Sequence, residues 1–207
     1  MSKMQKKLSE IAEIQLGFPF RGKLEDLPAG HVCVIQPKDI DSNGEVNWGT
    51  VARVSLPGRA KPLYLKNGDI LIPGKGRDNS PKRVFGIAED QLVVASPYFF
   101  TVRVPHKALI DSRGAFIYWW LKQRPTRDYF SRYAAGSAVK NITKSVIENT
   151  LVILPSEAEM DEVIVCDVFI EQHTQTLYKL IENNKKVAEG IAQNLAAKYL
   201  VKSKNSN

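Results

Sequence analysis

The alternation of apolar and polar positions separates a part of the chain with strand-like texture from a helical part. Between residues 32 and 104, short runs of β-branched and aromatic residues are separated by Gly, Pro, Asn and Asp, which is typical of short strands joined by turns and long loops. We expect strands at 32–35, 63–65, 69–72, 84–87, 92–95 and 99–104, with a turn at 41–44. These runs predict a mixed or antiparallel sheet.

The helical part begins after residue 107. Residues 116–121 fit a helix that packs on the sheet, and Pro125 suits the first position of a second helix that continues to Tyr133. We expect a short helix at 143–147 and a last strand at 150–154. The apolar spacing of residues 8–16 fits either a short helix or a strand and does not decide between them. The predicted fold class is therefore α+β.

A heptad spacing dominates the end of the chain, which has no Pro after Pro155. Eight positions, here called the seam, recur at alternating steps of four and three residues: Ile170, Thr174, Leu177, Ile181, Asn184, Ala188, Ile191 and Leu195. A helix of about 30 residues spans about 45 Å, longer than a domain of this size. We therefore expect one long coiled-coil-type helix with an external partner, rather than a helix that lies on its own domain. Asn184 is a polar seam residue of the kind that sets register or partner number.

The net charge of +7 is concentrated in the middle of the chain. Residues 51–140 hold 16 Lys and Arg against 6 Asp and Glu, whereas the remainder holds 13 against 16. A basic region inside a folded domain indicates a polyanionic partner. Charge reports the sign of a partner and not its identity, so a basic surface without a specific role is the alternative.

Two basic segments carry residue types that read DNA. The loop 74–83 and the segment 136–144 combine Lys and Arg with amide and hydroxyl side chains. Arg binds guanine edges, Asn binds adenine and Lys contacts phosphate, while the helix start near residue 143 offers backbone N–H groups to a phosphate. With the loop 17–23 included, the candidate DNA-binding residues are Arg21, Lys23, Lys75, Arg77, Asn79, Lys82, Arg83, Ser137, Lys140, Asn141 and Lys144. A solvated surface loop is the alternative for each segment.

Motifs for chemistry are missing. The glycines around Lys75 lack the spacing of a phosphate-binding loop, and His31, His106 and His173 have no companions at metal-ligand spacing. We expect no catalytic centre, no cofactor and no metal. Cys33 and Cys166 lie in apolar runs and predict buried free thiols of a reducing compartment. No run approaches the about 20 apolar residues of a membrane span, and no signal peptide is evident, so we expect a cytoplasmic protein.

An ordered set of motifs resembles the target recognition domain of type I restriction–modification specificity subunits. The motifs are Leu8–Gly17, Phe20–Gly22, Ile35–Ile40 with Gly44 and Trp48, Leu65–Ile72 with its Gly-Asp-Ile-Leu, Gly136 with Ile142, Thr143 and Ile147, and Leu151–Pro155 before the long helix. Family members usually carry two such domains and two long helices, whereas this chain has one of each. The Glu-Gln pair that often follows Pro155 in the family is replaced by the segment 156–161.

The resemblance implies a DNA target recognition domain at 1–155 and a helix at 156–202 for dimerisation and partner docking. The polar composition of the last residues predicts a disordered tail at 203–207. The resemblance implies a non-catalytic subunit that reads half of a bipartite site in double-stranded DNA. The single domain and helix imply a half-subunit that works as a homodimer, or a related single-domain system. The resemblance also implies docking of a methyltransferase subunit and through it of restriction subunits. An assembly adaptor without sequence-specific DNA reading is the alternative, and a stand-alone methyltransferase or nuclease is a third that lacks the motifs.

Overall fold

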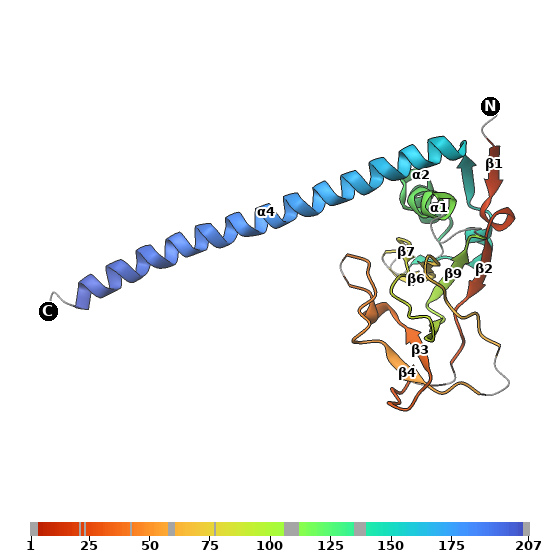
Figure 1. Cartoon of the computed structure of the whole chain (residues 1–207), viewed down its shortest axis with the longest axis horizontal. Coiled ribbons are helices and arrows are strands. Elements are labelled where there is room, and N and C mark those ends of the chain that lie inside the picture. Colours follow the sequence, from red (N-terminus) through yellow and green to blue (C-terminus); the bar gives the residue numbers. More distant parts are fainter. Residues whose placement is uncertain are drawn as a thin grey trace. The chain divides into compact units, whose positions relative to one another are not determined.

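The chain divides into two compact units, residues 1–164 and residues 165–207. In the computed structural model, the described residues are 4–20, 22, 24–41, 43–57, 61–76, 78–105, 112–134 and 140–204, without the side chains of Lys140 and of residues 199–204. The described residues of the first unit form a four-stranded sheet, a three-stranded sheet, two two-stranded sheets and three short α-helices. The second unit is part of one long helix (Figure 1).

One sheet is antiparallel, with its strands in the order β2-β9-β5-β7. Its strands are β2 (Glu13–Leu16), β9 (Phe99–Arg103), β5 (Ile70–Pro73) and β7 (Lys82–Arg83). Val102 is aligned with both Ile14 and Ile70, and it is fully buried between them. Every residue of β5 is buried, which explains why its sequence is an unbroken apolar run.

The second sheet is mixed, with β3 (Val32–Ile35) in its centre. β3 pairs with β4 (Ala52–Val54) in antiparallel and with β8 (Leu92–Ala95) in parallel orientation. Alternate residues of β3 enter two hydrophobic clusters, Val32 and Val34 in one, Cys33 and Ile35 in the other. The prediction of mixed and antiparallel sheets is confirmed.

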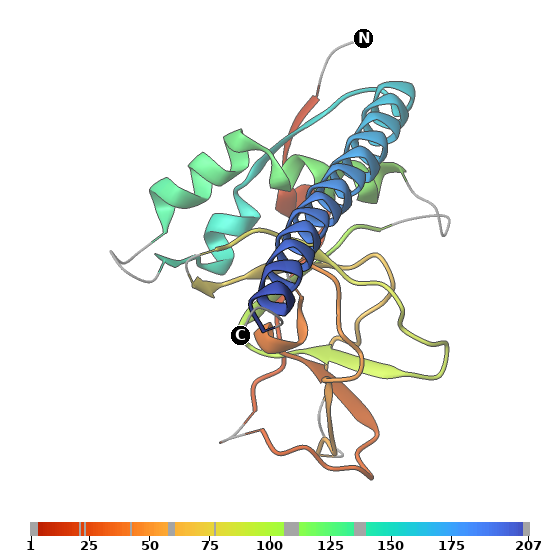
Figure 2. The ribbon, with the colours of Figure 1, turned by 90° about the vertical axis from the view of Figure 1, so that its left-hand side faces the viewer.

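Three helices join the four-stranded sheet in a common core. They are α1 (Ser112–Lys122), α2 (Arg124–Tyr133) and α3 (Lys144–Glu148). Ile117, Phe130 and Ile147 bring one apolar side chain from each helix into a cluster that includes Ile72 and Val102. Figures 1 and 2 show α1 and α2 at one end of this unit and β3 with β4 at the other.

A two-stranded antiparallel sheet joins the beginning of the chain to the start of the long helix. β1 (Met4–Lys7) pairs with β11 (Leu151–Leu154), and Trp120 Nε1 donates to the Leu151 carbonyl at 2.9 Å. β1 was not among the predicted strands, because its residues lack strand-typical side chains and only the pairing with β11 defines it. A 3-10 helix, η1 (Leu8–Glu10), followed by β2 accounts for the ambiguous period of residues 8–16.

Two predicted strands are wrong. Residues 63–65 make only an isolated backbone bond, from Leu65 N to Val93 O at 2.7 Å. Residues 84–87 form no strand. Val84 exchanges backbone bonds with Gly68 and Asp69 of the turn before β5, and the Asn67 side chain bonds both the N–H and the carbonyl of Ile87 at 2.9 Å each. The predicted turn at 41–44 is confirmed by the bonds that Asp41 Oδ1 accepts from the backbone and by the positive φ of Gly44.

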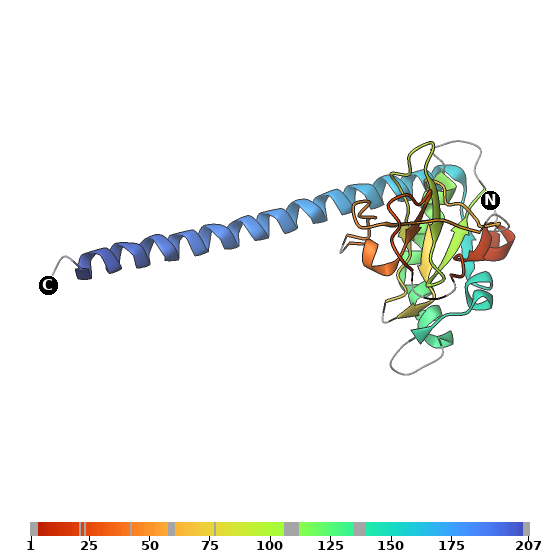
Figure 3. The ribbon, with the colours of Figure 1, turned by 90° about the horizontal axis from the view of Figure 1, so that it is seen from below.

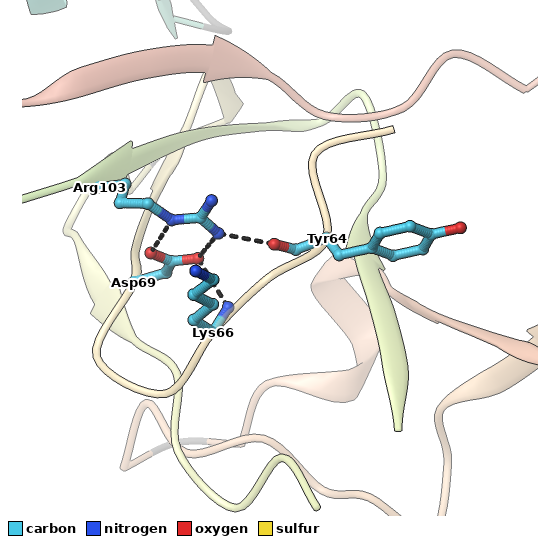
Figure 4. A network of polar contacts seen from close by, with 4 residues as sticks. All are labelled: Tyr64, Lys66, Asp69 and Arg103. Atoms are coloured by element: carbon cyan, nitrogen blue, oxygen red, sulfur yellow. Dashed lines mark hydrogen bonds and ion pairs between the residues drawn. The ribbon is translucent and has the colours of Figure 1, made fainter. Parts of the chain in front are cut away.

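A buried ion pair fastens the turn before β5 to β9 (Figure 4). Asp69 is 4% exposed and accepts hydrogen bonds from Arg103 Nε at 2.9 Å and Arg103 Nη2 at 2.6 Å. The same carboxylate accepts the Lys66 N–H, while Arg103 Nη2 also reaches the Tyr64 carbonyl. The bonds to Asp69 raise the pKa of Arg103 against the effect of burial. The Gly-Asp-Ile-Leu motif thus has a structural role here.

The long helix α4 (Glu157–Lys204) confirms the predicted C-terminal helix (Figures 1 and 3). Its 48 residues correspond to about 72 Å at a rise of about 1.5 Å per residue. Ser156 and Glu159 exchange hydrogen bonds as a capping box at its start. Met160 and Ile164 pack on the core of the first unit, so that unit includes the first turns of α4 beyond the predicted boundary at residue 155. α4 extends two residues into the predicted tail, and residues 205–207 lie outside the described residues.

Candidate nucleic-acid interface

Strand pairing brings the two predicted basic segments together. β6 (Lys75–Gly76) pairs in antiparallel orientation with β10 (Lys140–Asn141), with Lys75 aligned to Asn141. The Ile142 N–H adds a hydrogen bond to the Gly74 carbonyl at 2.8 Å. Lys75 and Asn141 are both exposed. Residues 66 positions apart in the sequence, Lys75 and Asn141, therefore lie side by side on one polar surface.

Two glycines allow the loop to follow this path. The Gly74 N–H donates to the Tyr98 carbonyl, and a Cβ at Gly74 would lie 2.8 Å from the ring of Phe100. Gly76 has a φ of 129°, and a Cβ there would lie 2.5 Å from the Tyr98 hydroxyl. A side chain at either position would push β6 away from β9 and out of register with β10.

Polar side chains inside the loop fix its shape. Asn79 Nδ2 donates to the Pro73 carbonyl at 2.8 Å, which ties the middle of the loop back to the end of β5. Asp78 Oδ1 accepts the Ser80 N–H at 2.8 Å and also the Ser80 hydroxyl. Asn79, predicted as an adenine contact, thus uses its amide group within the loop.

The last basic pair of the loop lies on β7 and is half-buried. The guanidinium of Arg83 lies over the Phe85 ring at 4.9 Å, and its Nη2 is 3.8 Å from the Cβ positions of Gly68 and Gly114. Arg83 is therefore turned toward the turn before β5 and toward α1. The side chain of Lys82 passes over Gly44, with its Cδ 3.1 Å from the Cβ position there.

The second segment offers Asn141 and Lys144. Lys144 is exposed and forms an ion pair with Glu148 at 3.4 Å. α3 has only five residues, and Thr143 Oγ1 accepts the Val146 N–H at 3.4 Å. The helix start therefore has one N–H fewer for a phosphate than the sequence analysis expected.

Four predicted DNA-binding residues lie outside the described residues: Arg21, Lys23, Arg77 and Ser137. Two residues that are absent from the predicted set belong to this site. Asp78 lies within the loop and Arg127 lies on α2, and both line a cavity of about 210 Å³ between the loop and α2. No local pattern in the sequence connects the helix that carries Arg127 to the loop.

The seam residues of α4 are all exposed. Ile170, Leu177, Ile181, Ile191 and Leu195 each have at least half of their surface accessible. Contiguous apolar exposure of this kind is characteristic of protein–protein contact surfaces. The predicted burial of Cys166 is wrong, because this part of α4 does not enter the core, whereas Cys33 is buried and accepts a hydrogen bond from Gln91.

Within the described residues, no three His, Cys, Asp or Glu side chains are grouped as a metal site. Among the same residues, no helix has the length and hydropathy to cross a bilayer.

Comparison with solved structures identifies the fold. No family model matches the chain, and no curated protein does. A type I restriction–modification S subunit from M. genitalium matches with a TM-score of 0.55 at 16% identity, over 89% of this chain and 43% of that one. The HsdS subunit from Thermoanaerobacter tengcongensis matches with a TM-score of 0.58 at 17% identity, over 84% and 38%.

A third structure comes from work on the structural basis of complex assembly and conformational transition of the type I restriction–modification system. It matches with a TM-score of 0.63 at 15% identity. The match covers 88% of this chain and 46% of the other chain. The chain has the fold of type I specificity subunits. It spans less than half the length of each of these structures.

Proposed function

We propose that this chain is a sequence-specific DNA-recognition subunit of a type I restriction–modification system. The observation that carries the proposal is the pairing of β6 with β10, which joins Lys75, Asn141 and the loop between β6 and β7 in one exposed polar surface. The specificity-subunit fold supports the same function. The globular residues 1–155 would read one half of a bipartite site in double-stranded DNA, without a catalytic step. Such a subunit acts on chromosomal DNA, so we expect it in the cytoplasm.

The long helix would supply the second half-site reader by pairing with a second copy. An antiparallel pair with its twofold axis between Glu182 and Asn183 would set Leu177 opposite Ala188 of the second copy. Leu177 would then meet the small Ala188, and Ile191 the smaller Thr174, which suits knobs-into-holes packing. Ile170 would meet Leu195, and Ile181 would meet the polar Asn184. The same register sets Leu180 close to Val187 of the second copy, and both side chains are more than half exposed in this chain. A twofold interface of this kind is closed and self-complementary.

The paired helices would also dock a methyltransferase subunit, and through it a restriction subunit. Support comes from the compared proteins, which are S subunits or components of type I restriction–modification systems. Apolar residues on α4 outside the seam, such as Val168 and Phe169, offer surface for such a partner.

Two steps test DNA recognition. The chain first selects duplexes from a randomised library, and the selected duplex then competes with a scrambled duplex at rising salt concentration. We expect a preference that persists when salt has removed most non-specific binding, because base contacts depend on salt less than phosphate contacts do. Equal loss of both duplexes would instead support an assembly adaptor. Co-purification of a methyltransferase with the tagged chain tests the docking.

A further inference from the structure

Asp78 is an exposed carboxylate in the centre of the basic loop between β6 and β7. Its Oδ1 accepts both hydrogen bonds from Ser80. Among the described residues, none donates to Oδ2 and none forms an ion pair with the carboxylate. The local turn therefore occupies one oxygen, and the other is available to a partner.

The carboxyl group is ionised at neutral pH. Partial burial alone would raise the pKa of Asp78, but the hydrogen bonds from Ser80 and the charge of Lys82 together lower the pKa below its usual value. An ionised carboxylate accepts hydrogen bonds and cannot donate them.

A negative charge in a DNA-binding loop is unfavourable beside phosphates unless it makes a compensating contact. In the major groove, the exocyclic amino groups of cytosine and adenine are the donors that a carboxylate recognises. The turn itself does not explain the charge, because an asparagine oxygen would accept the same bonds from Ser80. Asp78 and Arg127 both line the cavity of about 210 Å³ between the loop and α2.

We propose that Oδ2 of Asp78 accepts a hydrogen bond from the amino group of a cytosine or an adenine in the major groove, which makes Asp78 a specificity-determining residue. The inference rests on the proposed DNA-recognition function. Asn79 holds the loop to Pro73 and thereby positions the neighbouring carboxylate.

Asp78→Asn is the decisive variant, because it keeps the shape of the side chain. The asparagine oxygen still accepts from Ser80, while Nδ2 replaces Oδ2 and turns an acceptor into a donor. At one position of the selected site, we expect the preference to change from cytosine or adenine to guanine or thymine, whose major-groove edges carry acceptor oxygens. The loss of discrimination at that position should be about tenfold to a hundredfold. Asp78→Ala should remove the preference without creating a new one.

Asp26→Asn is the matched control. Asp26 is also exposed and accepts one backbone hydrogen bond, from the N–H of Arg53 on β4. The Asp26→Asn substitution should leave every base preference unchanged. The measurement is library selection with the full chain, in parallel for all variants. Unchanged preferences in both Asp78 variants would overturn the inference while the proposed function stands. A wild-type chain that selects no sequence would overturn both.

Discussion

The side-chain amide of Asn79 donates a hydrogen bond to the carbonyl of Pro73, 2.8 Å away, and so closes the basic loop onto the strand that precedes it. Asn79→Ala should lower the free energy of unfolding by about 1 kcal/mol, the usual net value of one hydrogen bond. Because the bond is local, the larger effect should be faster amide hydrogen exchange within residues 74–83. Unaltered exchange in this loop would show that the bond does not restrain it.

Removal of Asp69 should be among the most destabilising changes at a polar residue. Asp69→Ala leaves Arg103 partly buried without its carboxylate, and we expect a loss of about 3 kcal/mol in urea unfolding. Asp128→Ala is the contrast, because its ion pair with Arg124 is largely exposed and should be worth less than about 1 kcal/mol. Similar losses in both variants would contradict the role assigned to burial.

The protonation of Asp78 should depend on Ser80. Because the folded pKa lies below its usual value, the Ser80 bonds stabilise the fold above the usual carboxyl pKa, and this stabilisation is lost as pH falls through the folded pKa. Ser80→Ala removes the hydroxyl bond and should move the Asp78 midpoint upward in an NMR titration. A midpoint that stays in place would mean that the backbone bond and Lys82 alone lower it.

The antiparallel pairing of α4 makes a prediction about paired substitutions. Leu177→Ala should leave a hole and Ala188→Leu should overpack, each weakening the dimer by about 2 kcal/mol per contact. The double variant exchanges the large and small partners and should recover most of the stability, as measured by sedimentation equilibrium. In a parallel pair each residue would face its own copy, and the double variant would bring no recovery.

Lys75 should contribute one phosphate contact. Lys75→Gln should weaken binding to all duplexes alike and reduce the slope of log affinity against log salt by about 1. Lys66→Gln is the matched control, since Lys66 is exposed beyond the opposite end of β5. Equal slopes of log affinity against log salt for both variants would show that Lys75 does not contact the DNA.

The sequence predicted those parts of the molecule that depend on local periodicity. The buried strands 32–35, 92–95 and 99–103, the helices from Ser112 and Arg124, and the long helix all follow from apolar spacing and Pro position. β1 was not predictable, because a strand without apolar alternation is defined by its partner. The false strand at 84–87 has strand-like residues whose backbone is bonded by an asparagine side chain instead.

The candidate interface was predictable as a set of residue types but not as an arrangement. Composition drew attention to the two basic segments, while their hydrogen-bonded pairing is a long-range contact that no local pattern encodes. From residue type alone, Asn79, Arg83 and Lys75 were all predicted to bind DNA. Their environments separate them, because Asn79 ties the loop, Arg83 faces the body of the domain and Lys75 faces solvent.

Under the proposed function, the ladder between β6 and β10 has a consequence for the engineering of new target sequences. A foreign loop grafted at residues 74–83 alone would have to pair with the original β10. A difference in loop conformation would then weaken the backbone hydrogen bonds between β6 and β10. A transplant of specificity from a relative should therefore carry residues 74–83 and 140–144 as one cassette, with Tyr98 retained or exchanged to suit the glycine at position 76.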